Sequence, residues 1–147
     1  MMTKTAAAYR PARTPGAFTP WGQSDHTKEI APGIIFYSTP SHGGAFVPAE
    51  IRAEWPQALR DFKTFAGGDW YEEDCDVQLV ILAHPESFKA ATVADAVRFA
   101  RAYCQDYAPA IYEWIDSDDE HATKARDIAD LYNALKSELD DATKPQQ

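Results

Sequence analysis

The residue types best suited to chemistry lie in Pro40–Gly44, whose sequence is PSHGG. Two adjacent glycines let backbone N–H groups point at one spot, as an oxyanion hole or anion site requires, and His42 supplies a general base. Cys75 is a candidate nucleophile, and a carboxylate such as Glu73 is another candidate partner for His42. The pattern fits a small enzyme centred on His42, and it also fits a turn that needs glycine for its backbone alone.

Several features argue against catalysis. Cys75 follows three acidic residues, and neighbouring carboxylates raise the pKa of a thiol, which is the reverse of activation. Ser41 directly precedes His42, and adjacent residues seldom hold the hydrogen-bond geometry of a catalytic dyad. The chain contains no G-x-S-x-G elbow and no phosphate-binding glycine pattern. We therefore expect a protein that is not an enzyme.

The histidines His26, His42, His84 and His121 are scattered, and no CxxC, HExxH or HxH pair occurs. Structural and catalytic zinc sites usually place two of their ligands close together in sequence. The acidic run 116–120 lacks the glycine and the closing glutamate of a calcium loop. The sequence predicts neither a metal site nor a cofactor.

Two stretches, 69–76 and 107–120, combine aromatic and acidic residues in a way that suits a protein-binding surface. Aromatic rings anchor interfaces, and carboxylates steer the approach of a basic partner. Together with the glycine-rich loop, these stretches supply the candidate binding residues, which are Ser41, His42, Gly43, Gly44, Trp70, Tyr71, Glu72, Glu73, Asp74, Trp114, Asp116, Asp118 and Asp119.

The charge distribution also favours a protein partner. The formal net charge is −9, and residues 1–20 contribute three positive charges and no negative one, which leaves −12 on the remaining chain. Such a surface repels phosphates, so direct nucleic-acid binding is not expected. A partner with a basic or nucleic-acid-binding surface is expected instead, although negative charge also serves solubility alone. The sequence does not predict an oligomeric state.

Residues 1–20 have no hydrophobic period and are predicted to form a disordered basic tail, with packing beginning at Trp21. A β-hairpin is predicted over 24–39, with its turn at Pro32-Gly33. After the PSHGG loop, in which Gly43 or Gly44 is expected to adopt a positive φ, a short apolar piece follows at 45–47.

The rest of the chain is predicted to be mostly helical. Residues 69–84 fit a helix with Tyr71, Cys75 and Leu79 on one face, and 77–82 alternatively fit a buried strand. The remaining predicted helices span 49–55, 56–65, 92–107 and 120–139. The helix over 92–107 is capped by Thr92 and has Val93, Ala96, Val97, Ala100 and Cys104 on one face. In the last helix, Ile128, Leu131, Leu135 and Leu139 recur at spacings of three and four.

These elements predict an α+β fold in which a small N-terminal antiparallel sheet packs with several C-terminal helices. One globular domain is expected over 21–140, with a frayed end at 141–147. No apolar run is long enough to span a membrane, and the N-terminus lacks the apolar core of a secretory signal. Two cysteines are too few for a disulfide-stapled secreted domain, so the expected location is the cytoplasm.

Three motifs carry a resemblance to known proteins: STPSHGG at 38–44, YEEDC at 71–75 and Pro-Glu-x-Phe at 85–88. Over about 21–107, the chain resembles a bacterial family of domain-of-unknown-function proteins found on plasmids, integrative elements and phages. The resemblance implies a mobile-element context and no particular reaction. It marks the two motif segments 41–44 and 72–75 as candidate functional positions, with His42 paired to a carboxylate of the acidic segment.

Overall fold

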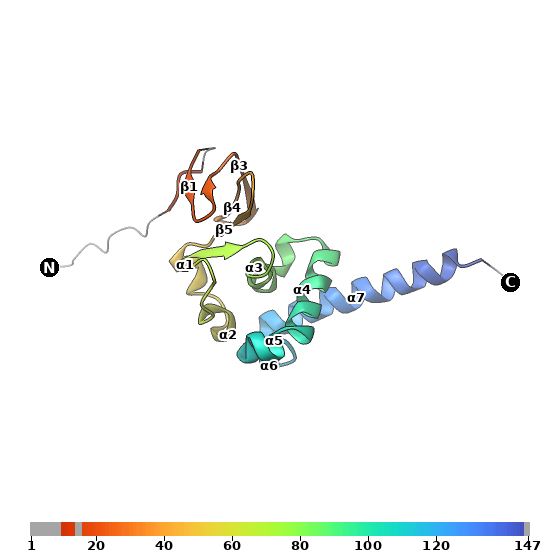
Figure 1. Cartoon of the computed structure of the whole chain (residues 1–147). Coiled ribbons are helices and arrows are strands. Elements are labelled where there is room, and N and C mark those ends of the chain that lie inside the picture. The colour runs from red at the N-terminus through yellow and green to blue at the C-terminus, as the bar shows by residue number, and fades with distance from the viewer. Residues whose placement is uncertain (1–9, 14–15, 146–147) are drawn as a thin grey trace. The chain divides into compact units, whose positions relative to one another are not determined.

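The computed structural model describes residues 10–13 and 16–145, which fall into two compact units (Figure 1). Unit 1 comprises the chain up to Trp55 and Lys63–Val77, and unit 2 comprises Pro56–Phe62 and the chain from Gln78 onward. Antiparallel strands lead and helices follow, which confirms the α+β prediction. The chain passes three times between the units, so no single linker divides it, and one domain over 21–140 stays a prediction.

Unit 1 contains the predicted hairpin, formed by β3 (His26–Ala31) and β4 (Ile34–Ser38). Gly33 closes its turn with a φ of +76°, a conformation that glycine adopts at little cost. The sheet continues through β5 (Gly43–Phe46) and β6 (Trp70–Glu72) in the order β3-β4-β5-β6, and each neighbouring pair is antiparallel. The short apolar piece after the PSHGG loop is therefore an inner strand.

The chain begins to pack before Trp21. β1 (Phe18–Thr19) pairs with β2 (Gly22–Gln23), and Ala17 is buried with Tyr37 and Phe46 in the core of unit 1. The hydroxyl of Tyr37 donates a hydrogen bond to the carbonyl of Ala12 at 3.1 Å. The predicted disordered tail is thus wrong for 16–20, while 1–9 and 14–15 lie outside the described residues.

The helix predicted over 69–84 is only half correct. Residues 70–72 form β6, because Trp70 and Tyr71 pair with β5 and their rings pack inside unit 1. The helix α3 (Val77–Ala83) begins five residues later, and five of its seven residues are buried. The strand alternative for 77–82 is therefore wrong, and tertiary pairing overrides the helical period in the first half.

Two short helices lie between β5 and β6 along the chain, α1 (Ala49–Arg52) in unit 1 and α2 (Gln57–Arg60) in unit 2. The second ends well before the predicted stop at Gly67-Gly68. The backbone N–H of Phe65 donates to the buried carboxylate of Asp76 at 3.1 Å, which is incompatible with continuing the helix through this residue.

Unit 2 also contains α3 from Gln78 onward, η1 (Pro85–Ser87), α4 (Ala90–Ala102), α5 (Cys104–Tyr107), α6 (Pro109–Ile115) and α7 (Glu120–Thr143). The helix α4 begins at Ala90, so the predicted cap at Thr92 is wrong. The predicted apolar face is buried, as expected, at Val93, Ala96, Val97, Ala100 and Cys104. None of the helices in the described ranges is long and apolar enough to cross a membrane.

The last helix is longer than predicted and buries a different face. It runs to Thr143, so residues 141–143 of the end predicted to fray are helical. Its buried residues are the alanines Ala122, Ala125 and Ala129, and the three leucines of the predicted apolar face are exposed at Leu131, Leu135 and Leu139.

Candidate functional site

The sheet of unit 1 brings the two sequence motifs together. The loop before β5 is closed by Thr39, whose N–H donates to the carbonyl of His42 at 2.8 Å and whose Oγ1 accepts from the His42 N–H at 3.1 Å. On the neighbouring strand β6, Glu72 lies opposite Gly44, and directly after this strand the Glu73 N–H donates to the Gly43 carbonyl at 3.0 Å. His42 therefore lies beside the end of β6.

The two loop glycines serve a different purpose from the one predicted. Neither has a positive φ, because both belong to the extended strand β5. A Cβ on Gly43 would lie 2.8 Å from the Tyr37 carbonyl oxygen, and a Cβ on Gly44 would lie 2.5 Å from the Tyr71 carbonyl oxygen and would overlap the Trp21 ring. Close approach of neighbouring strands and of a tryptophan, rather than a left-handed turn, requires glycine here.

Three titratable side chains converge at this edge of the sheet. A ring nitrogen of His42 and carboxylate oxygens of Glu72 and Glu73 all lie within 4.8 Å of one another. The Glu72 carboxylate accepts hydrogen bonds from the N–H groups of Asp74 at 3.0 Å and Cys75 at 3.3 Å, which fix its position. Partial burial and the nearby Asp74 carboxylate raise the pKa of Glu72, although these two hydrogen bonds oppose the shift.

Cys75 is exposed and free, and its environment does not activate it. Burial, followed by the charges of Glu72, Asp76 and Asp74, raises the pKa of its thiol above the ordinary value of 9.0. A thiol with this pKa is protonated at neutral pH and is a weak nucleophile. Cys104 is also free, and burial raises its pKa to about 11. The geometry therefore gives His42 carboxylate neighbours without an activated thiol.

The remaining candidate binding residues divide into core and surface. Tyr71 and Trp114 are buried, and Trp70 is half-buried against Tyr37 and Phe46, so these rings stabilise the fold rather than a partner. Among the acidic candidates, Asp116 pairs with Arg101 at 2.7 Å. Exposed candidates are Ser41, His42, Glu73, Asp74, Asp116 and Asp118, while Glu72 and Asp119 are half-buried, and Gly43 and Gly44 are buried.

The exposed leucines of α7 were not among the functional residues predicted from the sequence. Leu131, Leu135 and Leu139 retain 63%, 56% and 65% of their accessible surface. Their period of three and four residues is visible in the sequence, where it predicts a face that packs inside the fold. A second face on the same helix, formed by Ala122, Ala125 and Ala129, is the signal that the leucine face is exposed rather than buried, because the alanines are the residues that pack.

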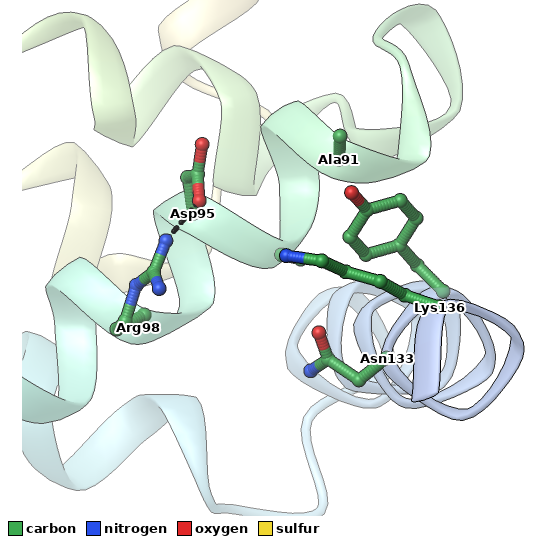
Figure 2. A pocket seen from close by; sticks show the side chains of 7 residues that line it. Ala91, Asp95, Arg98, Asn133 and Lys136 are labelled. Atoms are coloured by element: carbon green, nitrogen blue, oxygen red, sulfur yellow. Dashed lines mark hydrogen bonds and ion pairs between the residues drawn. The ribbon is translucent and has the colours of Figure 1, made fainter. Parts of the chain in front are cut away.

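A polar pocket of about 270 Å³ lies between α4 and α7 in unit 2 (Figure 2). Asp95 and Arg98 of α4 form an ion pair on one side, and Lys136 of α7 reaches toward α4 on the other. The other lining residues are Ala91, Ala94, Tyr132 and Asn133. On α7 the pocket is lined by Tyr132, Asn133 and Lys136, which lie in the same stretch of the helix as the exposed Leu131 and Leu135.

No curated protein and no solved structure matches this chain. The family model described as Domain of unknown function (DUF7007) matches residues 14–134. The matched range includes the PSHGG loop, the acidic end of β6 and α7 as far as Ala134, and it extends well past Tyr107, where the resemblance carried by the sequence motifs ends. The chain belongs to the DUF7007 family of domains of unknown function.

Proposed function

We propose that this DUF7007 protein acts by binding another protein, and that the exposed leucines of α7 are its docking surface. The occupant is an amphipathic helix of the partner that carries apolar residues on one face and lysine or arginine beside them. This is a helix-to-helix mode in which spaced apolar anchors supply affinity and charged flanks supply orientation.

The observation that carries the proposal is the exposure of Leu131, Leu135 and Leu139 on one face of one helix. Successive residues of an α-helix are rotated by about 100°, so these three side chains and Ile128 fall within an arc of about 80°. Figure 1 shows the C-terminal half of α7, in blue, extending beyond α4. A contiguous apolar stripe of this kind in water marks an interaction site.

The charges beside the stripe determine which partner fits. Asp127 and Glu138 lie on its edge by helical position, and the segment 127–143 contains five carboxylates against the single lysine Lys136. A second copy of this chain would bring another net charge of −9 to the interface, which opposes self-association. A basic amphipathic helix gains attraction at the same position.

The wider role that we propose is that of a non-enzymatic accessory protein of a mobile genetic element. The resemblance of the sequence motifs to plasmid, integrative-element and phage proteins supports this context. Covering a basic, nucleic-acid-binding surface of a host nuclease is one anti-defence activity that an acidic protein with an apolar anchor can perform. Two free cysteines fit a reducing compartment such as the bacterial cytoplasm.

A peptide titration tests the proposal. The probe is a synthetic helical peptide with leucines on one face and lysines beside them, and its control is the same composition in scrambled order. We expect the full-length protein to bind the ordered peptide, and the variant L131Q/L135Q/L139Q to bind it at least about tenfold more weakly. Loss of about 1.4 kcal/mol suffices for that factor, and burying a leucine is worth roughly 1.5–3 kcal/mol.

Two matched variants control for nonspecific effects. A134Q/S137Q changes exposed positions on another face of the same helix, and F65Q removes the phenylalanine of unit 1 that retains 97% of its accessible surface. Both should bind like the wild type. Equal binding of the scrambled peptide, or full affinity in the triple leucine variant, would contradict the proposal. A concentration-dependent dimer that the leucine substitutions dissolve would instead identify a second copy as the occupant.

A further inference from the structure

We infer that His42, Glu72 and Glu73 form a binding site for a divalent transition-metal ion of the zinc type at the end of the unit 1 sheet. The site uses residues that the proposed docking surface does not use, so it can be tested independently of α7. Its basis is the convergence of one imidazole nitrogen and two carboxylate oxygens within 4.8 Å of one another.

The backbone builds this convergence from two segments about 30 residues apart in sequence. The Glu73 N–H bonds to the Gly43 carbonyl at 3.0 Å, and Gly44 lies opposite Glu72, so the loop residue and the two glutamates share one end of the strand pair β5-β6. The two amide hydrogen bonds to the Glu72 carboxylate hold one ligand in place before any ion arrives. Such outer bonds orient metal ligands in known sites.

The separation of the donor atoms suits a shared ion. Zinc binds nitrogen and oxygen ligands at about 2.1 Å in a tetrahedral arrangement, which places two ligands of one ion about 3.4 Å apart. The three donor atoms lie within 4.8 Å of one another, and rotation of the exposed His42 and Glu73 side chains would bring them to this separation. No direct ion pair joins His42 to either glutamate among the described residues.

The negative charges of Glu72 and Glu73 also favour a bound cation. Within the part of the chain that the structure describes, no arginine or lysine forms an ion pair with Glu72 or Glu73, whereas Arg52 pairs with Asp69 elsewhere in unit 1. A divalent ion would neutralise the two adjacent carboxylates. The imidazole favours zinc and its neighbours over magnesium and calcium, which prefer oxygen ligands alone. Three protein ligands would leave a position for water.

Calorimetric titration of the chelator-treated full-length protein with Zn²⁺ tests the inference. We expect one saturable site per chain, weakened at least about tenfold in H42Q and in E73Q because each removes one of three ligands. The matched controls H26Q and E54Q change an exposed histidine and an exposed glutamate of the same unit, and should bind Zn²⁺ like the wild type. Thermal unfolding without metal checks that each variant is folded.

Two further arms distinguish this site from a thiolate site at Cys75 and from unselective cation binding by carboxylates. C75S should retain the affinity, because the thiol is not among the three ligands, and Mg²⁺ should not produce a saturable site in the same concentration range. The inference is overturned if no saturable Zn²⁺ site appears, if H42Q and E73Q bind like the wild type, or if H26Q and E54Q weaken binding equally. It is also overturned if C75S abolishes binding or if Mg²⁺ binds as tightly as Zn²⁺.

Discussion

At Gly44, the missing side chain allows three parts of unit 1 to meet. The Trp21 ring and the Tyr71 carbonyl occupy the space that a Cβ would need, and the position lies inside the sheet with an ordinary strand conformation. The same closeness of β5 and β6 places His42 beside the two glutamates. The strand pairing at this glycine therefore also brings together the residues of the candidate metal site.

Replacing Gly44 with alanine should destabilise the protein by roughly 1–3 kcal/mol, because a backbone carbonyl must move to admit the methyl group. For a folding unit of about 60–100 residues, this lowers the melting temperature by about 4–8 °C per kcal/mol, as measured by circular dichroism. The control is Ser41→Ala in the exposed loop, which should change stability by less than about 0.5 kcal/mol. Equal melting of both variants would contradict the close-packing explanation.

The sequence fitted both a functional loop and a turn that needs glycine, and the positive φ expected of such a turn is wrong. A pair of glycines after a strand is the common mark of a turn, whereas the Trp21 ring and Tyr71 carbonyl that exclude a side chain come from residues distant in sequence. The buried rings of Tyr71 and Trp114 illustrate the same limit. Aromatic residues among acids resemble an interface in sequence, and only the packed structure shows which rings are core.

The helix α7 is held at both ends by hydrogen bonds and an ion pair that involve side chains close in sequence. Asp119 caps its N-terminus, since its carboxylate accepts from the N–H groups of His121 at 2.9 Å and Ala122 at 3.2 Å. At the other end, the Thr143 hydroxyl donates to the Asp140 carbonyl at 3.0 Å, and Lys144 pairs with Asp141 at 3.2 Å. These contacts support a helix that its neighbours cover along only part of its length.

We predict that Asp119→Ala lowers the free energy of unfolding by about 0.5–2 kcal/mol, because two N–H groups lose their acceptor. Asp119→Asn should restore most of the loss, since asparagine is an equally good cap. Asp118→Ala, at the exposed neighbouring position, is the matched control and should change little. Urea unfolding of the three variants measures the differences, and an equal effect at Asp118 and Asp119 would show that charge, not capping, matters.

Hydrophobic periodicity predicted α7 well and its packing poorly. The period of three and four residues identifies a helix whether or not another element covers its apolar face. Here the alanines contact the rest of unit 2, and the leucines remain in water. For β6 the helix itself was predicted wrongly. The residues 69–84 have a helical period, but the first part of this segment pairs with β5, and a local sequence pattern does not encode that pairing.

For the whole molecule, turn residues and hydrophobic periodicity were sufficient to predict an α+β fold, and the sequence carries a formal net charge of −9. The candidate metal site was not predictable by ligand spacing, because His42 is about 30 residues from Glu72 and Glu73 and strand pairing brings them together. The proposed docking surface was not predictable either, because it depends on which residues of α7 the rest of unit 2 leaves exposed. The residues of the candidate metal site lie in the two sequence motifs, and strand pairing brings these motifs together, whereas the exposed leucines of α7 lie in neither motif.

The net charge of −9 is a property of the whole molecule, and it implies that the affinity for a basic partner depends on salt concentration. Attraction between a basic helix and the carboxylates near the leucines is screened within about 10 Å at about 0.1 M salt, whereas burial of leucine is not screened. Peptide affinity should therefore fall between about 0.05 M and about 0.5 M salt and then level off, with the leucines supplying the residual affinity.

Hydrogen–deuterium exchange of the full-length protein, with and without the basic amphipathic peptide, tests the docking surface most directly. Helix ends without tertiary cover open readily, so the amides of residues 131–143 should exchange fast in the free protein. We predict that the peptide slows exchange in this segment and leaves the loop at His42 unchanged. Protection confined to other segments, or none at saturating peptide, would contradict the assignment of α7 as the docking surface.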